Sequence, residues 1–265
     1  MLLAIDVGNS ETKLGFFSSV MSSASPERTW RVTTVSRRTA DEYGVLFAAL
    51  FRRAEIPLGR VRAIAISSVV PSGDAALAEA CEHYFNATPL FITAATQSLI
   101  DVATERPREL GSDLLSAAIG AKERYGTPLV AIGYGTATTF SAVSREGAFI
   151  GAAIAPGIRI SVDALIARAA KLPQVALEVP NGPIGRETVS SLQSGIVFGF
   201  VGQTEGIVAR FRAVVGEDAT VVATGGLADV IARHTTAIDA VEPHLVLLGL
   251  RKYYSEHSTD AARVV

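Results

Sequence analysis

Two short stretches of the sequence place glycine, hydroxyl and carboxylate groups directly after apolar runs. Near the N-terminus, residues 2–5 are followed by Asp6-Val7-Gly8-Asn9-Ser10. In the middle of the chain, the apolar run from Val130 leads into Gly133-Tyr134-Gly135-Thr136-Ala137-Thr138-Thr139. Turns of this composition offer backbone N–H groups and hydroxyls to an anion, and glycine leaves room for a phosphate. The repeated pattern predicts two half-sites for one polyphosphate.

Each stretch also has an ordinary structural interpretation, since Asp, Gly and Asn favour hairpin turns and threonine favours strands. The repetition strengthens the phosphate hypothesis, and so does Thr224-Gly225-Gly226 near the C-terminus. Its glycines would let an adenine or ribose approach the backbone. Asp6, at the end of its strand, is placed to hold Mg²⁺ through water and so neutralise phosphate charge.

Composition excludes several classes of protein. The chain has 265 residues, of which 49% are hydrophobic and 19% charged, as in globular proteins. A net charge of −2 argues against nucleic acid as a partner. A single cysteine, Cys81, excludes an internal disulfide, and the four histidines lack metal-ligand spacing. We expect a cytoplasmic protein without a leader peptide or membrane span.

The elements that must position these residues alternate between strands and helices. In the first half we expect a serine-rich loop at 21–25, strands at 2–5, 12–17, 30–35, 61–66 and 90–93, and helices at 41–56, 72–84 and 114–125. Residues 101–111 are irregular. The second half repeats the order more loosely, which predicts an α/β protein with two similar lobes, 1–115 and 116–265, and a ligand between them.

In the second lobe, a hairpin from Val130 to Gly151 precedes a turn at 154–157 and a helix at 161–170. The longest helical pattern, 186–215, contains Gly195, Gly199, Gly202 and Gly206 at helical spacing, which favours a close helix–helix crossing such as a dimer interface. A strand at 220–223, a short helix to about 234, a closing helix at 243–254 and a loose tail at 255–265 complete the prediction.

Many short motifs occur together in a fixed order. They are Asp6-Val7-Gly8-Asn9-Ser10 with Gly15, Ser67-Ser68-Val69-Val70-Pro71, Gly111-Ser112-Asp113, Gly135-Thr136-Ala137-Thr138-Thr139, Ile154-Ala155-Pro156-Gly157, Leu172-Pro173, Ile184-Gly185-Arg186 with Thr188, Ser194-Gly195, Thr224-Gly225-Gly226 and Leu248-Gly249-Leu250. Over nearly its whole length, the chain thus resembles the type III pantothenate kinases of the actin, Hsp70 and sugar-kinase superfamily. The resemblance implies two actin-like (ribonuclease H-like) lobes with a nucleotide cleft between them.

The resemblance also implies an activity, the ATP-dependent phosphorylation of pantothenate in the first step towards coenzyme A. Asp113 would accept the proton of the attacking hydroxyl, at a helix N-terminus that favours its negative charge, although helix capping is an equal alternative from sequence. Thr188 would face the pantothenate of a neighbouring protomer. The implied substrate-binding residues are Gly111, Ser112, Asp113 and Thr188, and those for Mg²⁺-ATP are Asp6, Gly8, Asn9, Ser10, Lys13, Gly135, Thr136, Thr138, Gly225 and Gly226.

The chain departs from the family pattern at the predicted site. Gly133 stands where the family has an aspartate that helps to hold a monovalent cation, and Leu114 stands where an arginine follows the motif aspartate. Thr104 and Arg106 replace a tyrosine and an asparagine of the substrate loop, and Glu187 replaces an asparagine. Losing an arginine removes a bidentate partner for a carboxylate or phosphate.

These departures lead to three hypotheses. In the preferred one, the chain is a subunit of a heterodimeric pantothenate kinase, and a paralogous partner holds the K⁺ or NH₄⁺ ion that Gly133 cannot. In the second, the chain is an active homodimer in which Arg106 replaces the missing arginine. In the third, it is a non-catalytic protein that binds or senses ATP, pantothenate or a coenzyme A precursor. A small sugar or acetate-type kinase is a further alternative.

Overall fold

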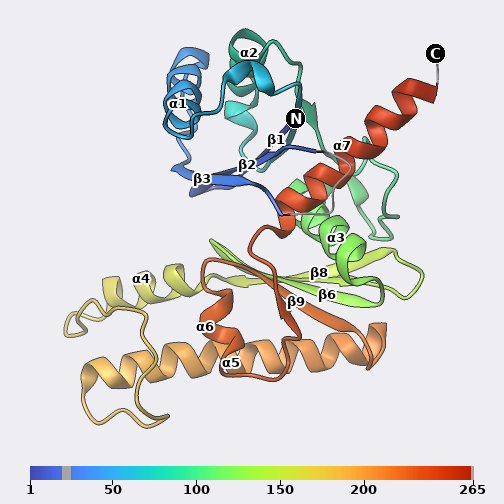
Figure 1. Ribbon diagram of the computed structural model, residues 1–265. Coiled ribbons are helices and arrows are strands. Elements are labelled where there is room, and N and C mark those ends of the chain that lie inside the picture. Colours follow the sequence, from blue (N-terminus) through green and yellow to red (C-terminus); the bar gives the residue numbers. More distant parts are fainter. Residues whose placement is uncertain (20–24, 264–265) are drawn as a thin grey trace. The chain divides into compact units, whose positions relative to one another are not determined.

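The computed structural model describes residues 1–19 and 25–263, with side chains up to His257 (Figure 1). The chain forms two compact units, Met1–Arg124 with His244–Val265, and Tyr125–Pro243. The predicted loop at 21–25 lies outside the described residues except for Ser25. Among the described residues, no helix has the length and apolarity needed to cross a membrane.

Both units contain a five-stranded sheet with the same plan. The sheet of the first unit has the order β3-β2-β1-β4-β5, and that of the second has the order β10-β9-β6-β7-β8. In each, an antiparallel meander of three strands is followed by two parallel strands. The strands are β1 (Leu2–Val7), β2 (Glu11–Phe17), β3 (Arg28–Thr33), β4 (Ala63–Ser68), β5 (Leu90–Phe91), β6 (Leu129–Tyr134), β7 (Ala137–Val143), β8 (Phe149–Pro156), β9 (Thr220–Gly225) and β10 (Ala240–Val241). The predicted α/β fold with two similar lobes is confirmed.

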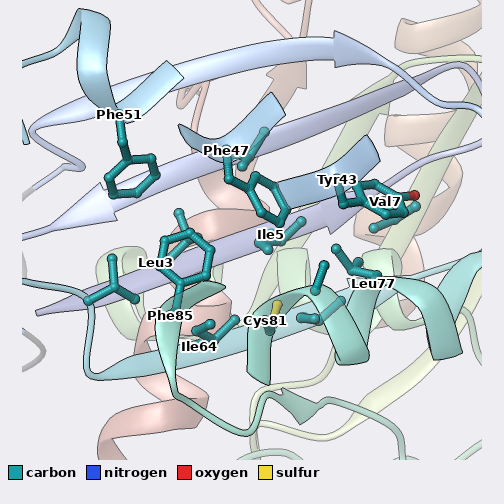
Figure 2. Close-up of a cluster of buried hydrophobic side chains, with 14 of the residues drawn as sticks. Leu3, Ile5, Val7, Tyr43, Phe47, Phe51, Ile64, Leu77, Cys81 and Phe85 are labelled. Carbon is teal, nitrogen blue, oxygen red and sulfur yellow. The ribbon is translucent and has the colours of Figure 1, made fainter. Parts of the chain in front are cut away.

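Helices cover the sheet of the first unit on both faces. The helices of this unit are α1 (Ala40–Arg53), α2 (Asp74–Phe85), α3 (Ser112–Tyr125) and α7 (Leu245–Arg263), with short 3₁₀ turns at Leu58–Arg60, Pro71–Gly73 and Pro107–Glu109. Figure 2 shows the aromatic side chains of α1 and α2 packed against Leu3, Ile5 and Val7 of β1. Helix α7 packs against β1 and β4. Every residue of β1 is therefore buried, which is why this strand is an unbroken apolar run apart from Asp6.

Helices α3 and α7 cross at two glycines. A Cβ atom added to Gly120 would lie 2.3 Å from the carbonyl oxygen of Leu245, and one added to Gly249 would lie within 2 Å of that of Ser116. Arg251 of α7, which is buried, forms an ion pair with Glu123 of α3 at 2.5 Å. The predicted loose tail at 255–265 is wrong over its described part, because α7 continues to Arg263. Buried Tyr253 and the Lys252–Glu256 pair support this extension.

In the second unit, one long helix covers a face of the sheet. The helices are α4 (Ile158–Arg168), α5 (Thr188–Val215) and α6 (Ala228–Ala232). Val201, Val208 and Val215 of α5 pack in one buried cluster with side chains of β6, β7 and β9. The predicted turn at 154–157 is wrong in part, because β8 pairs with β7 as far as Pro156 and α4 begins at Ile158.

The division of the chain differs from the predicted boundary at 115. The first unit continues to the end of α3 and also includes α7, which the sequence prediction had assigned to the second lobe. The physical reason is the burial of Leu247, Leu248 and Leu250 of α7, together with the contacts of that helix with β1 and β4. A helix at the end of the chain thus completes the core that begins with its first strand.

Candidate active site

Asp6 lies at the centre of a polar cluster in the first unit. In the sheet register it pairs with Lys13 of β2 on one side and with Ser67 of β4 on the other. Its side chain is buried, and burial raises the pKa of the Asp6 carboxyl to about 7. Lys13 and a hydrogen bond with Ser67 lower this pKa, whereas the nearby charge of Asp113 raises it. The cluster therefore contains two carboxylates close enough for the charge of Asp113 to act on Asp6.

Helix α3 starts beside this cluster, which is why Asp113 lies near Asp6. The Ser112 hydroxyl donates to the carbonyl oxygen of Ser68 at 2.9 Å and lies 3.0 Å from the Ser67 hydroxyl. These buried contacts fix the first turn of α3 against the end of β4. Asp113 Oδ1 accepts the N–H of Leu114 at 2.8 Å, and a Cβ at position 111 would lie 2.6 Å from this oxygen. A side chain at position 111 would thus crowd the Asp113 carboxylate in this position.

The tip of the β1–β2 hairpin offers fewer backbone donors than the sequence predicted. The Gly8 N–H donates to the carbonyl oxygen of Glu11 at 3.1 Å, and the Gly8 carbonyl accepts the Thr34 hydroxyl at 2.7 Å. Asn9 and Ser10 are exposed at the tip. An anion bound here would therefore meet Asn9 and Ser10 before it met the Gly8 N–H.

The corresponding turn of the second unit is packed closely by glycines. A Cβ added to Gly157 would lie 2.2 Å from the Thr136 carbonyl oxygen, and one added to Gly225, where φ is +103°, would lie 2.4 Å from the Tyr134 carbonyl oxygen. Gly135 and Thr136 are exposed at the tip, as is Gly226 beyond β9.

Thr138, one of the predicted nucleotide-binding residues, is fully buried in the second unit. Its hydroxyl has no hydrogen-bond partner among the described residues. An unpaired buried hydroxyl is costly, so this turn contains a polar group that an added water or ligand could satisfy. The turn fits an anion through Gly135 and Thr136, which are at the surface, more directly than through Thr138.

The departures from the family pattern have clear positions in the structure. Gly133 pairs with Thr139 across the β6–β7 hairpin, and a side chain at 133 would come within 2.7 Å of the Thr139 hydroxyl. Without a carboxylate, this position does not fit a monovalent cation. Arg106 is exposed and pairs with Glu109 at 3.1 Å, while the buried Thr104 hydroxyl has no partner among the described residues.

Glu187 and Thr188 form the start of α5 in the second unit. The Glu187 carboxylate accepts the N–H groups of Ser190 at 2.7 Å and Val189 at 3.1 Å, as an N-cap. Thr188 is the first helical residue and is exposed. Glu187 thus has a structural role here, and Thr188 lies in a different unit from Gly111, Ser112 and Asp113.

Sequence reasoning missed two parts of the site. Ser67 was noted only within a motif, although the parallel pairing of β1 and β4 places it beside Asp6. A cavity of about 740 Å³ in the first unit, bordered by Gly111, Ser112 and Arg108, was not expected. Strand pairing could have indicated the first, but a cavity wall formed by separate segments leaves no local sequence signal.

Within the described residues, no group of three or more His, Cys, Asp or Glu side chains could hold a metal ion. As a single carboxylate at the end of β1, Asp6 fits a metal that takes most of its ligands from water and phosphate, which is the usual behaviour of Mg²⁺.

The chain is similar to known proteins over most of its length. The family model described as type III pantothenate kinase matches residues 2–210. A type III pantothenate kinase of Anaeromyxobacter sp. (strain K) is 45% identical over 251 residues, covering 95% of this chain and 97% of the relative. That of Myxococcus xanthus (strain DK1622) is 44% identical over 257 residues, covering 97% and 99%.

Among solved structures, a protein of Sinorhizobium meliloti described as a 2-dehydro-3-deoxygalactonokinase has a similar fold. Its TM-score is 0.56 at 14% identity, with 100% of this chain and 97% of that chain covered. At this identity the similarity concerns the fold alone. On the family model and the 45% identity, the chain belongs to the type III pantothenate kinase family.

Proposed function

We propose that this chain takes part in the ATP-dependent phosphorylation of pantothenate. The observation that carries the proposal is the pair of carboxylates Asp6 and Asp113 in the first unit, which lie close enough for the charge of Asp113 to raise the pKa of Asp6. One lies at the end of a strand with Lys13 beside it, and the other lies at the start of a helix. Membership of the family, whose relatives are named as pantothenate kinases, supports the choice of acceptor.

The two carboxylates take different roles in this proposal. Asp113 accepts the proton of the pantothenate hydroxyl as that oxygen attacks the γ-phosphorus of ATP and the bond to ADP breaks. Ser67 and Ser112 position Asp113 by fixing the first turn of α3. Lys13 provides positive charge beside Asp6.

Asp6 would hold Mg²⁺ through water, and the ion when bound neutralises phosphate charge. Asn9 and Ser10 in the first unit, and Gly135, Thr136, Gly225 and Gly226 in the second, are proposed for the nucleotide. Because the raised pKa of Asp6 favours its protonated form below about pH 7, binding of Mg²⁺-ATP should release a proton and strengthen as the pH rises.

The second unit offers a surface for a partner subunit. A Cβ added to Gly195, Gly199 or Gly202 of α5 would meet no described atom within 4 Å. At about 100° per residue, these glycines lie roughly 150° around the helix from its buried valines. Exposed apolar side chains occur in the same unit: Ile154, Ile160, Leu165, Val179, Ile184 and Val189. We propose that this surface forms the dimer interface.

The finer proposal is a heterodimeric kinase. Gly133 provides no carboxylate for a cation and Leu114 provides no positive charge beside Asp113, while Asp6 and Asp113 are kept. A paralogous subunit would complete the missing groups, and Thr188 at the exposed start of α5 would serve a neighbouring protomer's substrate.

The test is phosphopantothenate formation by the chain alone and with a co-encoded paralogue. We expect the pair to be at least tenfold faster than either chain alone, and replacing Asp113 with Asn in this chain to slow the pair. Glu82→Gln, at an exposed carboxylate of the same unit, is the control. Equal rates for the lone chain and the pair would exclude the heterodimer.

One observation favours a second candidate, an active homodimer. Arg108 borders the cavity next to Gly111 and Ser112. It could replace the arginine that the family has at the position of Leu114. Full activity of the lone chain would support it. Binding of ATP or pantothenate without turnover, with or without a paralogue, would instead favour a sensor.

A further inference from the structure

The first unit contains a cavity whose chemistry is not explained by the carboxylate cluster. Its volume is about 740 Å³, and all of its lining residues belong to this unit. The walls come from the end of β4, the first half of α2, β5 with the turn that follows it, and residues 108–112. It therefore reaches the Gly111-Ser112 corner that positions Asp113.

The walls are mostly apolar, and their neutral polar groups are already engaged. Val69, Phe91 and Leu110 are among the apolar lining residues. The Ser68 hydroxyl donates to the Asp74 carboxylate, and the Thr93 hydroxyl is hydrogen-bonded in the turn with Thr96. An apolar chamber with few free polar groups is suited to a small organic molecule with a branched hydrocarbon part.

Among the described residues that line this cavity, Arg108 has the only cationic side chain. It lies in the 3₁₀ turn Pro107–Glu109, where the neighbouring acid, Glu109, pairs with Arg106 instead. With the described residues, Arg108 makes no ion pair or hydrogen bond. A guanidinium at the border of an apolar cavity is a strong partner for a carboxylate, because it can form two parallel hydrogen bonds.

We infer that Arg108 binds the carboxylate of the acceptor substrate, with the hydrocarbon part in the cavity and the reacting hydroxyl towards Asp113. This rests on the proposed function, since pantothenate carries a carboxylate at one end and hydroxyls beside a branched carbon at the other. Arg106, which the second sequence hypothesis used to replace the missing arginine, is not among the cavity residues and is paired with Glu109.

The experiment measures binding of two ligands to the full chain by calorimetry, since the cavity lies within one unit. The ligands are pantothenate and pantothenol, its neutral analogue with a hydroxymethyl group in place of the carboxylate. We expect Arg108→Gln to weaken pantothenate binding by about 10- to 100-fold and to leave pantothenol binding unchanged. Arg108→Lys should recover part of the loss, and the control Arg106→Gln should bind both ligands as the original chain does.

Each contrary result has a separate meaning. Unchanged pantothenate binding by Arg108→Gln would overturn the role of Arg108 and leave the proposed function standing. An equal loss of affinity for pantothenate and pantothenol would also overturn the role of Arg108. It would show that Arg108 supports the structure of the cavity and does not bind the carboxylate. If the original chain bound neither ligand, the proposed function and this inference would fail together.

Discussion

The two units place very different side chains on the same framework. Residue by residue, β1 and β6 correspond, so that Asp6 matches Gly133 and Gly8 matches Gly135. Across the first sheet, Asp6 lies between Lys13 and Ser67, whereas Gly133 lies between Thr139 and Thr224. Repetition of the strand plan thus reproduces the backbone turn, while the charges of the site are concentrated in the first unit.

The two units also differ in what surrounds the glycines of their helices. In the first unit, Gly120 and Gly249 let α3 and α7 touch, and a Cβ at either would collide with a backbone carbonyl. In the second unit, Gly195, Gly199 and Gly202 of α5 contact nothing within reach of a Cβ. Glycines in helices therefore mark a helix contact already made within the first unit, and positions on α5 that no described atom covers in the second.

The largest effect should come from replacing Asp113, a carboxylate of the first unit. Asp113→Asn removes the proposed proton acceptor and should lower kcat by about 10²–10⁴-fold in the active assembly, with little change in ATP affinity. Steady-state phosphorylation and nucleotide binding would measure the two effects. A rate within threefold of the original would refute the assignment of Asp113 as base in this chain.

Asp6→Asn should change how stability depends on pH. The folded pKa of about 7 exceeds the ordinary value of 3.8, so the folded chain holds this proton more tightly than the unfolded chain. Without Mg²⁺, the contribution of the Asp6 carboxyl to the free energy of unfolding should fall as the pH rises from about 4 to about 7, by a few kcal/mol in all. The variant should lose this fall and also bind Mg²⁺-ATP more weakly.

Urea unfolding at pH 5 and pH 8 would measure the effect, with Glu82→Gln as the matched exposed carboxylate. The same difference between the two pH values in the original and in Asp6→Asn would mean that Asp6 does not titrate in this range.

Two glycine-to-alanine substitutions, one in each unit, would test the difference between the helical glycines. Gly249→Ala should lower the free energy of unfolding by about 1–3 kcal/mol, because its Cβ meets the Ser116 carbonyl. Gly199→Ala should leave the folded monomer unchanged or stabilise it by up to about 1 kcal/mol through helix propensity, but should weaken subunit association. Urea unfolding and sedimentation would separate the two effects. Retained association in Gly199→Ala would argue against the proposed interface.

The smallest effect on the rate is expected from Gly133→Asp, which gives the second unit the residue type that the first unit has at Asp6. Gly133→Asp would restore a carboxylate to the second hairpin, at the cost of displacing the Thr139 hydroxyl. We expect less than a tenfold gain in rate, with a new preference for K⁺ or NH₄⁺ over Na⁺. Gly133→Ala, which adds volume without charge, is the control. The same response to all three ions in both variants would show that position 133 is not the missing cation site.

Local sequence was enough to predict most of the elements and the motifs of the site. The buried run of β1 followed from apolarity, and the helix predicted at 114–125 begins only two residues earlier, at Ser112; both signals depend on neighbouring residues. The extension of α7 to Arg263 was missed because its stabilising contacts, such as Arg251 with Glu123, lie far away in the sequence.

Only the tertiary structure decided what each candidate residue touches. Pairing of β1 with β4 placed Ser67 beside Asp6, and burial, which no local pattern records, raised the pKa of that carboxyl. Folding also engaged Arg106 with Glu109 and left Arg108 at the border of the cavity. The residue types were set by the sequence, but their protonation and their partners depend on distances between segments that only the folded chain brings together.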